Sequence, residues 1–294
     1  MHKVGEIMKR MIYCSTGTTV SRRNGYNFHL VTQLFPQLQQ QGIIDGAEFM
    51  MIPAYYPQMK AVADEWLGEG LTFPVIHCEK EVGTLLSDAA AAKSAGESAA
   101  ADVLLRQALD DFKKNCEMGA MAGSSRMVFH LWGGLNSDGH IAYNISVLPQ
   151  LMEIICPYGI RLLIENVPCT TKDPLSNWKS MSMYLDKCGL IFDTRFGFFH
   201  RQIGNIWQAE DIYPRIEHIH IGDIRGAEKD FSTLRPIYHP GEGMVDFQSV
   251  VRRLNEVGYS GTVTLESPVA TDGGADGDKL KASLLYTRNL FAEK

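Results

Sequence analysis

The sequence lacks the features that mark secreted, membrane and zinc-knuckle proteins. Its six cysteines include no C-x-x-C pair, and such scattered thiols favour a reduced protein over a disulfide framework or a zinc knuckle. No stretch of about 18 apolar residues is present to cross a bilayer. The first residues, MHKVGEIMKRMIYC, also lack the apolar core and cleavage site of a secretory signal. We therefore expect a cytoplasmic protein with no membrane partner.

An excess of positive charge is also missing. The 294 residues carry a formal net charge of −6, and the isoelectric point is near 5.9. Such a balance argues against a large basic face for nucleic acid. With 45% hydrophobic and 21% charged residues, the chain has an ordinary globular composition with ample material for a core. Neither a nucleic-acid partner nor extensive disorder is expected.

Eight short β-rich runs alternate along the chain with segments of helical length. The predicted strands are Met11 to Thr19, Asp45 to Pro53, Phe73 to Lys80, Arg126 to Gly134, Arg161 to Pro168, Leu190 to Gly197, Ile216 to Asp223 and Gly261 to Pro268. Segments with helical periodicity are Asn27 to Gln41, Val103 to Gly119, Ile141 to Cys156, Asp246 to Val257 and Lys279 to Phe291.

The order of these elements predicts the fold class. Because the strands are apolar nearly throughout, they suit a parallel sheet that is covered on both faces. Eight βα units predict a (β/α)8 TIM barrel of the α/β class, forming a single domain over residues 1–294. The Ala-rich stretch from Asp88 to Asp102 is expected to be an exposed helix or loop rather than a linker, because the alternation continues across it.

Polar side chains stand where four consecutive predicted strands end, at the functional face of a parallel barrel. Glu165 follows LLI, Asp193 follows LIF, His220 lies within HIHIGD, and Glu266 follows TVTL. Three carboxylates and one imidazole make an oxygen-rich site, and so many like charges are unfavourable without a cation. We expect these four residues to bind a divalent metal, Mn2+ first, with Mg2+, Co2+ and Zn2+ as alternatives.

Three further histidines lie on predicted strands. His218 shares the HIH tripeptide with His220, and period-two alternation puts both on the same side of the strand at different depths. We therefore expect His218 in the core or behind the ligands. His77 follows FPVI and His130 follows MVF. These two are predicted to bind substrate, while a second metal or simple lining of the mouth stay open as alternatives.

These residues resemble the xylose isomerase-like TIM barrel superfamily, which includes ketose epimerases, inosose-handling enzymes and apurinic endonucleases of the same fold. The resemblance covers nearly the whole chain. It is carried by Leu162 to Asn166, Ile191 to Thr194, HIHIGD with Arg225, His239 to Phe247 and Gly258 to Pro268.

The resemblance implies an activity and residue roles. The implied activity is metal-dependent isomerisation or epimerisation of a small sugar, ketose or cyclitol by proton transfer next to a carbonyl, through an enediolate. Glu165 and Glu266 then act as the catalytic acid and base besides binding metal, and Arg225 binds substrate hydroxyls. A small-molecule sugar is the expected partner, and pairing into a homo-oligomer stays open.

One departure from the family pattern keeps alternatives open. Phe196 stands where the epimerases usually carry a substrate-binding histidine, which leaves a non-catalytic sugar-binding barrel as one alternative. A metal-dependent endonuclease or phosphodiesterase is another, because His77 and His130 together with the four ligands match its first two metals. The ligands of its third metal are missing, since Phe196, Arg235 and Ile237 stand at those places.

Overall fold

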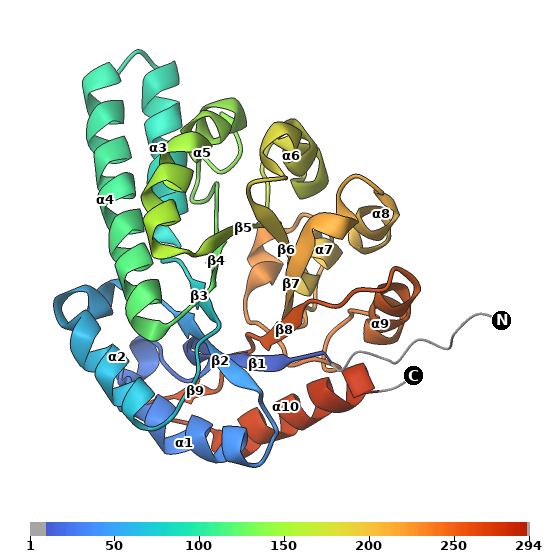
Figure 1. Ribbon diagram of the computed structural model, residues 1–294. Helices are drawn as coiled ribbons and strands as arrows, with labels where there is room; N and C mark the ends of the chain where they lie inside the picture. Colours follow the sequence, from blue (N-terminus) through green and yellow to red (C-terminus); the bar gives the residue numbers. More distant parts are fainter. Residues whose placement is uncertain (1–9, 293–294) are drawn as a thin grey trace.

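The computed structural model describes residues 10–292, so residues 1–9 and 293–294 of the predicted domain lie outside the described residues. Eight parallel strands form a closed barrel in chain order, and β8 pairs with β1 (Figure 1). The strands are β1 (Ile12–Ser15), β2 (Gly46–Met50), β3 (Val75–His77), β4 (Arg126–Phe129), β5 (Arg161–Glu165), β6 (Gly189–Asp193), β7 (Ile216–Ile221) and β8 (Thr262–Leu265). This topology confirms the predicted (β/α)8 barrel.

Helices connect the strands and surround the barrel (Figure 1). They are α1 (His29–Gln40), α2 (Met59–Gly68), α3 (Glu81–Ser94), α4 (Ser98–Ala122), α5 (Ile141–Ile155), α6 (Pro174–Ser180), α7 (Thr194–Phe199), α8 (Ile203–Gln208), α9 (Phe247–Glu256) and α10 (Gly277–Ala292). A small hairpin of β9 (Ala270–Thr271) and β10 (Gly274–Ala275) follows β8. The Ala-rich stretch lies in α3 and α4, which project side by side from the barrel (Figure 1). Within residues 10–292, no helix combines the length and apolarity needed to cross a membrane.

The strands are shorter than predicted, and the sixth strand shows why. The prediction was a strand from Leu190 to Gly197, but β6 ends at Asp193 and α7 begins at the next residue. The carboxylate of Asp193 accepts hydrogen bonds from the backbone N–H groups of Arg195 at 2.6 Å and Phe196 at 3.1 Å. This cap starts a helix directly after the strand.

Side chains fill the inside of the barrel in layers, because successive residues of a strand point to opposite faces. An apolar layer is formed by Tyr13, Val75, Val128, Leu163 and Ile191. Two residues further along the same strands, toward their carboxyl ends, come Ser15, His77, His130, Glu165 and Asp193. The apolar layer therefore closes the bottom of a polar layer that lies at the functional end of the barrel.

Asp223 fixes the course of the loop that follows β7. Its buried carboxylate accepts hydrogen bonds at 2.8–3.0 Å from the backbone N–H groups of Ile224, Gly241, Gly243 and Val245. One side chain therefore provides the acceptor for four backbone donors, three of which lie in the segment 241–245.

The role of Asp223 can be measured by urea unfolding. Asp223→Ala is expected to lower the free energy of unfolding by about 1–3 kcal/mol, because four N–H groups lose their acceptor. Asp272→Ala is the matched control, since Asp272 is exposed and pairs with Arg23 at the surface. The control is expected to change the free energy by less than about 0.5 kcal/mol. Equal stabilities of the two variants would contradict the role assigned to Asp223.

Candidate metal centre

The four residues predicted to bind a metal lie together at the carboxyl ends of neighbouring strands. Glu165 and Asp193 are the last residues of β5 and β6, His220 is the next to last of β7, and Glu266 directly follows β8. One potential ligand atom from each residue lies within 4.8 Å of the others. All four side chains are buried. The structure thus forms the predicted cluster, and its role in metal binding stays a prediction.

Glu48 also belongs to this region, although the sequence analysis did not single it out. Its Oε2 accepts hydrogen bonds from Nε2 of His220 at 2.9 Å and from Nε2 of His218 at 3.0 Å. Its side chain is fully buried. A signal exists in the sequence, because Glu48 is an acidic residue inside the short apolar strand GAEFM. His218 lies one layer below His220, as the alternation of the strand predicts.

The contact with Glu48 determines which nitrogen of His220 faces the cluster. Because Nε2 donates to Glu48, Nδ1 turns toward Oε1 of Glu165 at 3.0 Å and Oε2 of Glu266 at 3.4 Å. Burial by itself lowers the pKa of His220. The negative charges of Glu266, Glu48 and Glu165 outweigh burial and hold this pKa well above its ordinary value. The surrounding carboxylates therefore favour a proton or a cation at Nδ1 of His220.

A buried arginine balances part of the negative charge. Nη2 of Arg195 lies 3.0 Å from Oδ2 of Asp193 and 3.8 Å from Oε2 of Glu266. Burial lowers the pKa of Arg195, but the neighbouring carboxylates outweigh burial and raise the pKa. The carboxylates of Glu165, Asp193 and Glu266 and the guanidinium of Arg195 together leave two net negative charges, and a protonated His220 balances the carboxylate of Glu48. That charge matches a divalent cation.

His77 and His130 join the cluster through Glu165. Nε2 of His130 lies 2.5 Å from Oε2 of Glu165, and Nε2 of His77 lies 3.6 Å from the same oxygen. Nδ1 of His77 donates to the carbonyl oxygen of Cys78 at 2.7 Å. Burial lowers the pKa of His130 to about 4, so its imidazole is neutral near pH 7. Their predicted contacts with substrate stay predictions.

Several buried atoms of this cluster have no hydrogen-bond partner within residues 10–292. They are Nε2 of His77, Nε2 of His130, Oε2 of Glu165 and Oε1 of both Glu48 and Glu266. Buried polar atoms are normally paired, so lone pairs that face one another require a proton or a cation between them. Because Nδ1 of His77 donates to the backbone, its Nε2 is the nitrogen that faces Glu165. The set of carboxylate and imidazole donors therefore fits a divalent metal.

Arg225, predicted to bind substrate, points to the loop after β7. It is exposed, its Nε donates to the carbonyl oxygen of Glu242 at 2.7 Å, and its guanidinium lies 4.6 Å from the centre of the Tyr238 ring. Within the described chain, its contacts are therefore with this loop rather than with the four clustered residues.

Phe196 places an aromatic ring against Arg195 instead of offering a polar group. The guanidinium of Arg195 lies 4.7 Å from the centre of its ring, which is a favourable cation–π distance. His200, four residues further on, accepts a hydrogen bond from the backbone N–H of Cys169 at 3.0 Å. Its Nε2 is therefore engaged with the backbone and does not replace the histidine that is missing at position 196.

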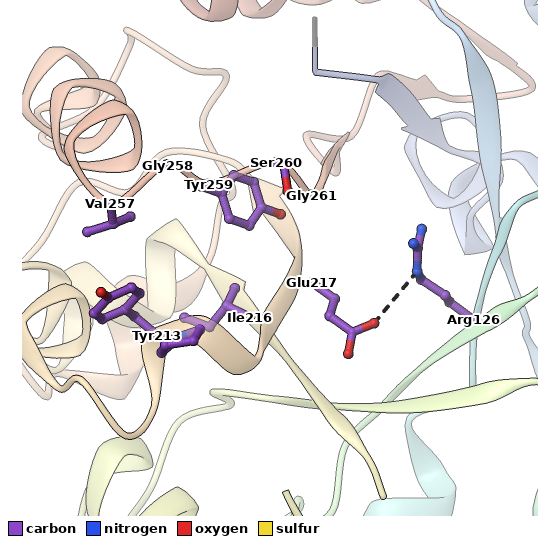
Figure 2. Close-up of a pocket in the computed structure, with 10 residues that line it drawn as sticks. Arg126, Tyr213, Ile216, Glu217, Val257, Gly258, Tyr259, Ser260 and Gly261 are labelled. Atoms are coloured by element: carbon purple, nitrogen blue, oxygen red, sulfur yellow. Dashed lines mark ion pairs between the residues drawn. The ribbon is translucent and has the colours of Figure 1, made fainter. Parts of the chain in front are cut away.

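A cavity of about 510 Å³ lies at the other end of the barrel (Figure 2). It is lined by the first residues of β4 and β7 and by the segment before β8. Its acidic residue, Glu217, pairs with Arg161 at 2.6 Å and with Arg126 at 3.9 Å. These charges compensate one another at the amino-terminal face, which in such barrels serves stability rather than catalysis.

Residues 42–290 match the sequence profile of the xylose isomerase-like TIM barrel family, and the chain belongs to that family. This match confirms the resemblance expected from the sequence segments. The fold is similar to that of 3-keto-D-glucoside 4-epimerase from E. coli, with a TM-score of 0.64, 17% identity and coverage of 96% of this chain and 100% of that chain. It is equally similar to an IolI protein with a bound zinc atom, with a TM-score of 0.65, 17% identity and coverage of 96% and 98%.

Curated relatives match over shorter segments. An uncharacterized protein of Methanocaldococcus jannaschii is 26% identical over 175 residues, which is 56% of each chain. An inosose dehydratase of Yersinia enterocolitica is 30% identical over 105 residues, covering 30% of this chain and 34% of that protein. An inosose isomerase of Halalkalibacterium halodurans is 30% identical over 128 residues, covering 42% and 44%. The chain therefore spans between about a third and just over half of the length of these relatives.

The compensating role of Arg195 can be tested in the presence of a chelator. Arg195→Met is expected to lower the free energy of unfolding in urea by about 3–5 kcal/mol, because Asp193 and Glu266 lose a buried cationic partner. Arg252→Met is the control, since Arg252 is exposed on α9, and it is expected to change stability by less than about 0.5 kcal/mol. If both variants unfold at the same urea concentration, Arg195 does not compensate the cluster.

Proposed function

We propose that this protein is a metal-dependent isomerase or epimerase of a small sugar, ketose or cyclitol. The observation that carries the proposal is the buried cluster of Glu165, Asp193, His220 and Glu266, which keeps two net negative charges after Arg195 is counted. The inosose isomerase and the 3-keto-D-glucoside 4-epimerase among the similar proteins support this class of reaction. The cytoplasmic location expected from the sequence is part of the same proposal.

Glu165, Asp193, His220 and Glu266 would hold the ion. Three carboxylates favour Mn2+, and Mg2+, Co2+ or Zn2+ are alternatives. The zinc atom of the similar IolI structure supports a divalent ion in a barrel of this fold. When bound, such an ion draws electron density from a substrate carbonyl and stabilises the negative charge that develops on its oxygen.

Glu165 and Glu266 are the proposed acid and base. Their carboxylates approach Nδ1 of His220 from β5 and from the end of β8. A substrate carbon between them can lose a proton to one carboxylate and receive a proton from the other. Return of the proton to the same carbon gives epimerisation, and return to the adjacent carbon gives isomerisation. Oε1 of Glu266 has no hydrogen-bond partner within residues 10–292, so it is available to accept this proton, whereas Oε2 of Glu165 faces Nε2 of His130 at 2.5 Å.

His77, His130 and Arg225 are the proposed contacts for substrate hydroxyls. His130 is partly exposed at the edge of the cluster, and as a neutral imidazole it can donate or accept a hydrogen bond. Arg225 packs on Tyr238, so it would meet only the part of a substrate that reaches the loop after β7.

Glu48 is expected to control metal affinity through His220. Glu48→Gln offers an amide in place of the carboxylate that orients Nε2 of His220. Loss of such an orienting carboxylate is expected to weaken Mn2+ binding about 10–100-fold, measured by calorimetric titration of the metal-free protein. Glu210→Gln, at an exposed position, is expected to keep the wild-type affinity. An unchanged affinity in Glu48→Gln would show that Glu48 does not act on the ion.

The proposed chemistry is tested by NMR detection of solvent deuterium in a panel of ketoses, aldoses and inososes. The Mn2+-loaded wild type is expected to introduce deuterium into at least one compound. Glu266→Gln is expected to slow this exchange about 100- to 10,000-fold because one proton-transfer group is lost, while Glu210→Gln keeps the wild-type rate. The proposal fails if no compound exchanges, or if Glu266→Gln exchanges as fast as the wild type.

A further inference from the structure

A cavity of about 240 Å³, which we call the mouth cavity, opens at the carboxyl ends of β1, β2, β3 and β8. Its apolar wall includes Met50 at the end of β2, Ile52 just beyond this strand, and Ile237 from the loop between β7 and α9. Glu266 lines the mouth cavity and also belongs to the buried cluster. The volume is below the roughly 300–1,000 Å³ of pockets for drug-sized ligands. A small molecule in this cavity would therefore contact one of the proposed proton-transfer groups.

Two cationic side chains line the mouth cavity. Lys80 comes from the loop after β3, and Arg235 comes from the loop between β7 and α9. Within residues 10–292, neither side chain forms an ion pair or a hydrogen bond. Two segments 155 positions apart in the sequence thus direct unpaired positive charge to one cavity.

The carboxylates near these cations have other partners. Glu79 also lines the mouth cavity, but its Oε1 accepts a hydrogen bond from the backbone N–H of Glu81 at 2.8 Å. Glu266 lies near Nη2 of Arg195 and Nδ1 of His220. Within residues 10–292, neither carboxylate lies within ion-pair distance of the two cations, although Glu266 interacts with both of them electrostatically over a longer distance.

The buried cluster has its own balance of charge, although the charge of Lys80 also lowers the pKa of Glu266. Its two net negative charges, counted with Arg195, equal the charge of one divalent ion. Lys80 and Arg235 then add positive charge to the mouth. Burial is the larger cause of the lowered pKa of Arg235, the nearby charge of Arg195 lowers this pKa further by like-charge repulsion, and the charge of Glu266 opposes the shift. An anion in the mouth cavity would relieve this repulsion.

Three backbone N–H groups of the glycine-rich loops are already engaged within the protein. Gly133 donates to Oγ of Ser87 at 3.1 Å. Gly241 and Gly243 donate to the carboxylate of Asp223 at 3.0 and 2.8 Å. These three glycines therefore do not supply the positive groups for an anion at the mouth, and Lys80 and Arg235 are the cationic side chains there.

We propose that the substrate is an anion, either a sugar acid or a sugar phosphate, whose oxyanion group binds between Lys80 and Arg235 while its reacting carbon lies beside Glu266. This inference rests on the proposed isomerase or epimerase function and narrows its substrate class. Carboxylate and phosphate groups share the oxygen acceptors that ammonium and guanidinium groups bind. The charged group takes no part in the proton transfer.

Matched neutral and anionic compounds test this substrate class. D-fructose is compared with D-fructose 6-phosphate, and D-glucose with D-glucuronate, by deuterium exchange with the Mn2+-loaded protein. The anionic member of at least one pair is expected to have the higher kcat/KM. Lys80→Met and Arg235→Met are each expected to lower that kcat/KM about tenfold or more, mainly through KM, because a charge-assisted contact is lost. A higher kcat/KM for D-fructose 6-phosphate than for D-fructose indicates a phosphate site, and a higher kcat/KM for D-glucuronate than for D-glucose indicates a carboxylate site.

Control variants and a second measurement make the outcomes distinct. Lys60→Met and Arg252→Met, at exposed positions of α2 and α9, are expected to keep the wild-type kcat/KM. If neutral compounds exchange as well as anionic ones and the mouth variants change nothing, the anion site is wrong and the proposed function stands.

If no compound exchanges, the proposed function fails, and calorimetric binding of inorganic sulfate to the Mn2+-loaded protein decides about the anion site alone. Sulfate binding that is weakened about tenfold or more in the double variant K80M/R235M supports the site, since two charged contacts are removed. Equal sulfate binding by the wild type and the double variant, or no binding to the wild type, overturns it.

Discussion

Mutual repulsion of Glu165, Asp193 and Glu266 is the constraint on which the functional end of this barrel depends. The three carboxylates are buried and close together, where a low dielectric makes repulsion between like charges strong. Arg195 balances part of this negative charge, and Nδ1 of His220 faces the carboxylate of Glu165. The residual charge and the unpaired buried oxygens favour a bound cation, and the proposed proton transfer depends on the same carboxylates.

The layered interior of the barrel makes this concentration of charge structurally feasible. The apolar side chains two residues earlier, such as Leu163 and Ile191, form a layer below the carboxylates. Glu48 and His218 lie below His220 and orient its ring from the side of the core. The cations Lys80 and Arg235 lie instead at the outer cavity. The carboxylates therefore place negative charge deep in the barrel, and Lys80 and Arg235 place positive charge at the mouth.

The fold and the four clustered residues could be predicted because both depend on local patterns. An apolar run that ends in a polar residue, such as LLIE at Glu165 or LIFD at Asp193, shows a buried strand and its functional end together. Glu48 could not be assigned in this way. Its role depends on contact with His220, which lies 172 positions later in the sequence, and only the closed barrel brings β2 and β7 to a common centre.

Arg195 could not be predicted for a different reason. The sequence suggested that the sixth strand continues to Gly197, whereas the cap formed by Asp193 turns the chain into α7 and folds Arg195 back onto the cluster. The surroundings of Arg225 depend likewise on a loop whose course is set by hydrogen bonds to Asp223. Such contacts arise from tertiary structure, so they cannot be predicted from the positions of strands and their ends in the sequence.

Anomalous diffraction from crystals grown with Mn2+, recorded at the manganese absorption edge, tests the central claim most directly. We expect one strong peak at about 2.0–2.4 Å from a carboxylate oxygen of Glu165, Asp193 and Glu266 and from Nδ1 of His220. A cluster without such a peak, or an ion bound by His77 and His130 in place of these four residues, would contradict the proposed metal centre.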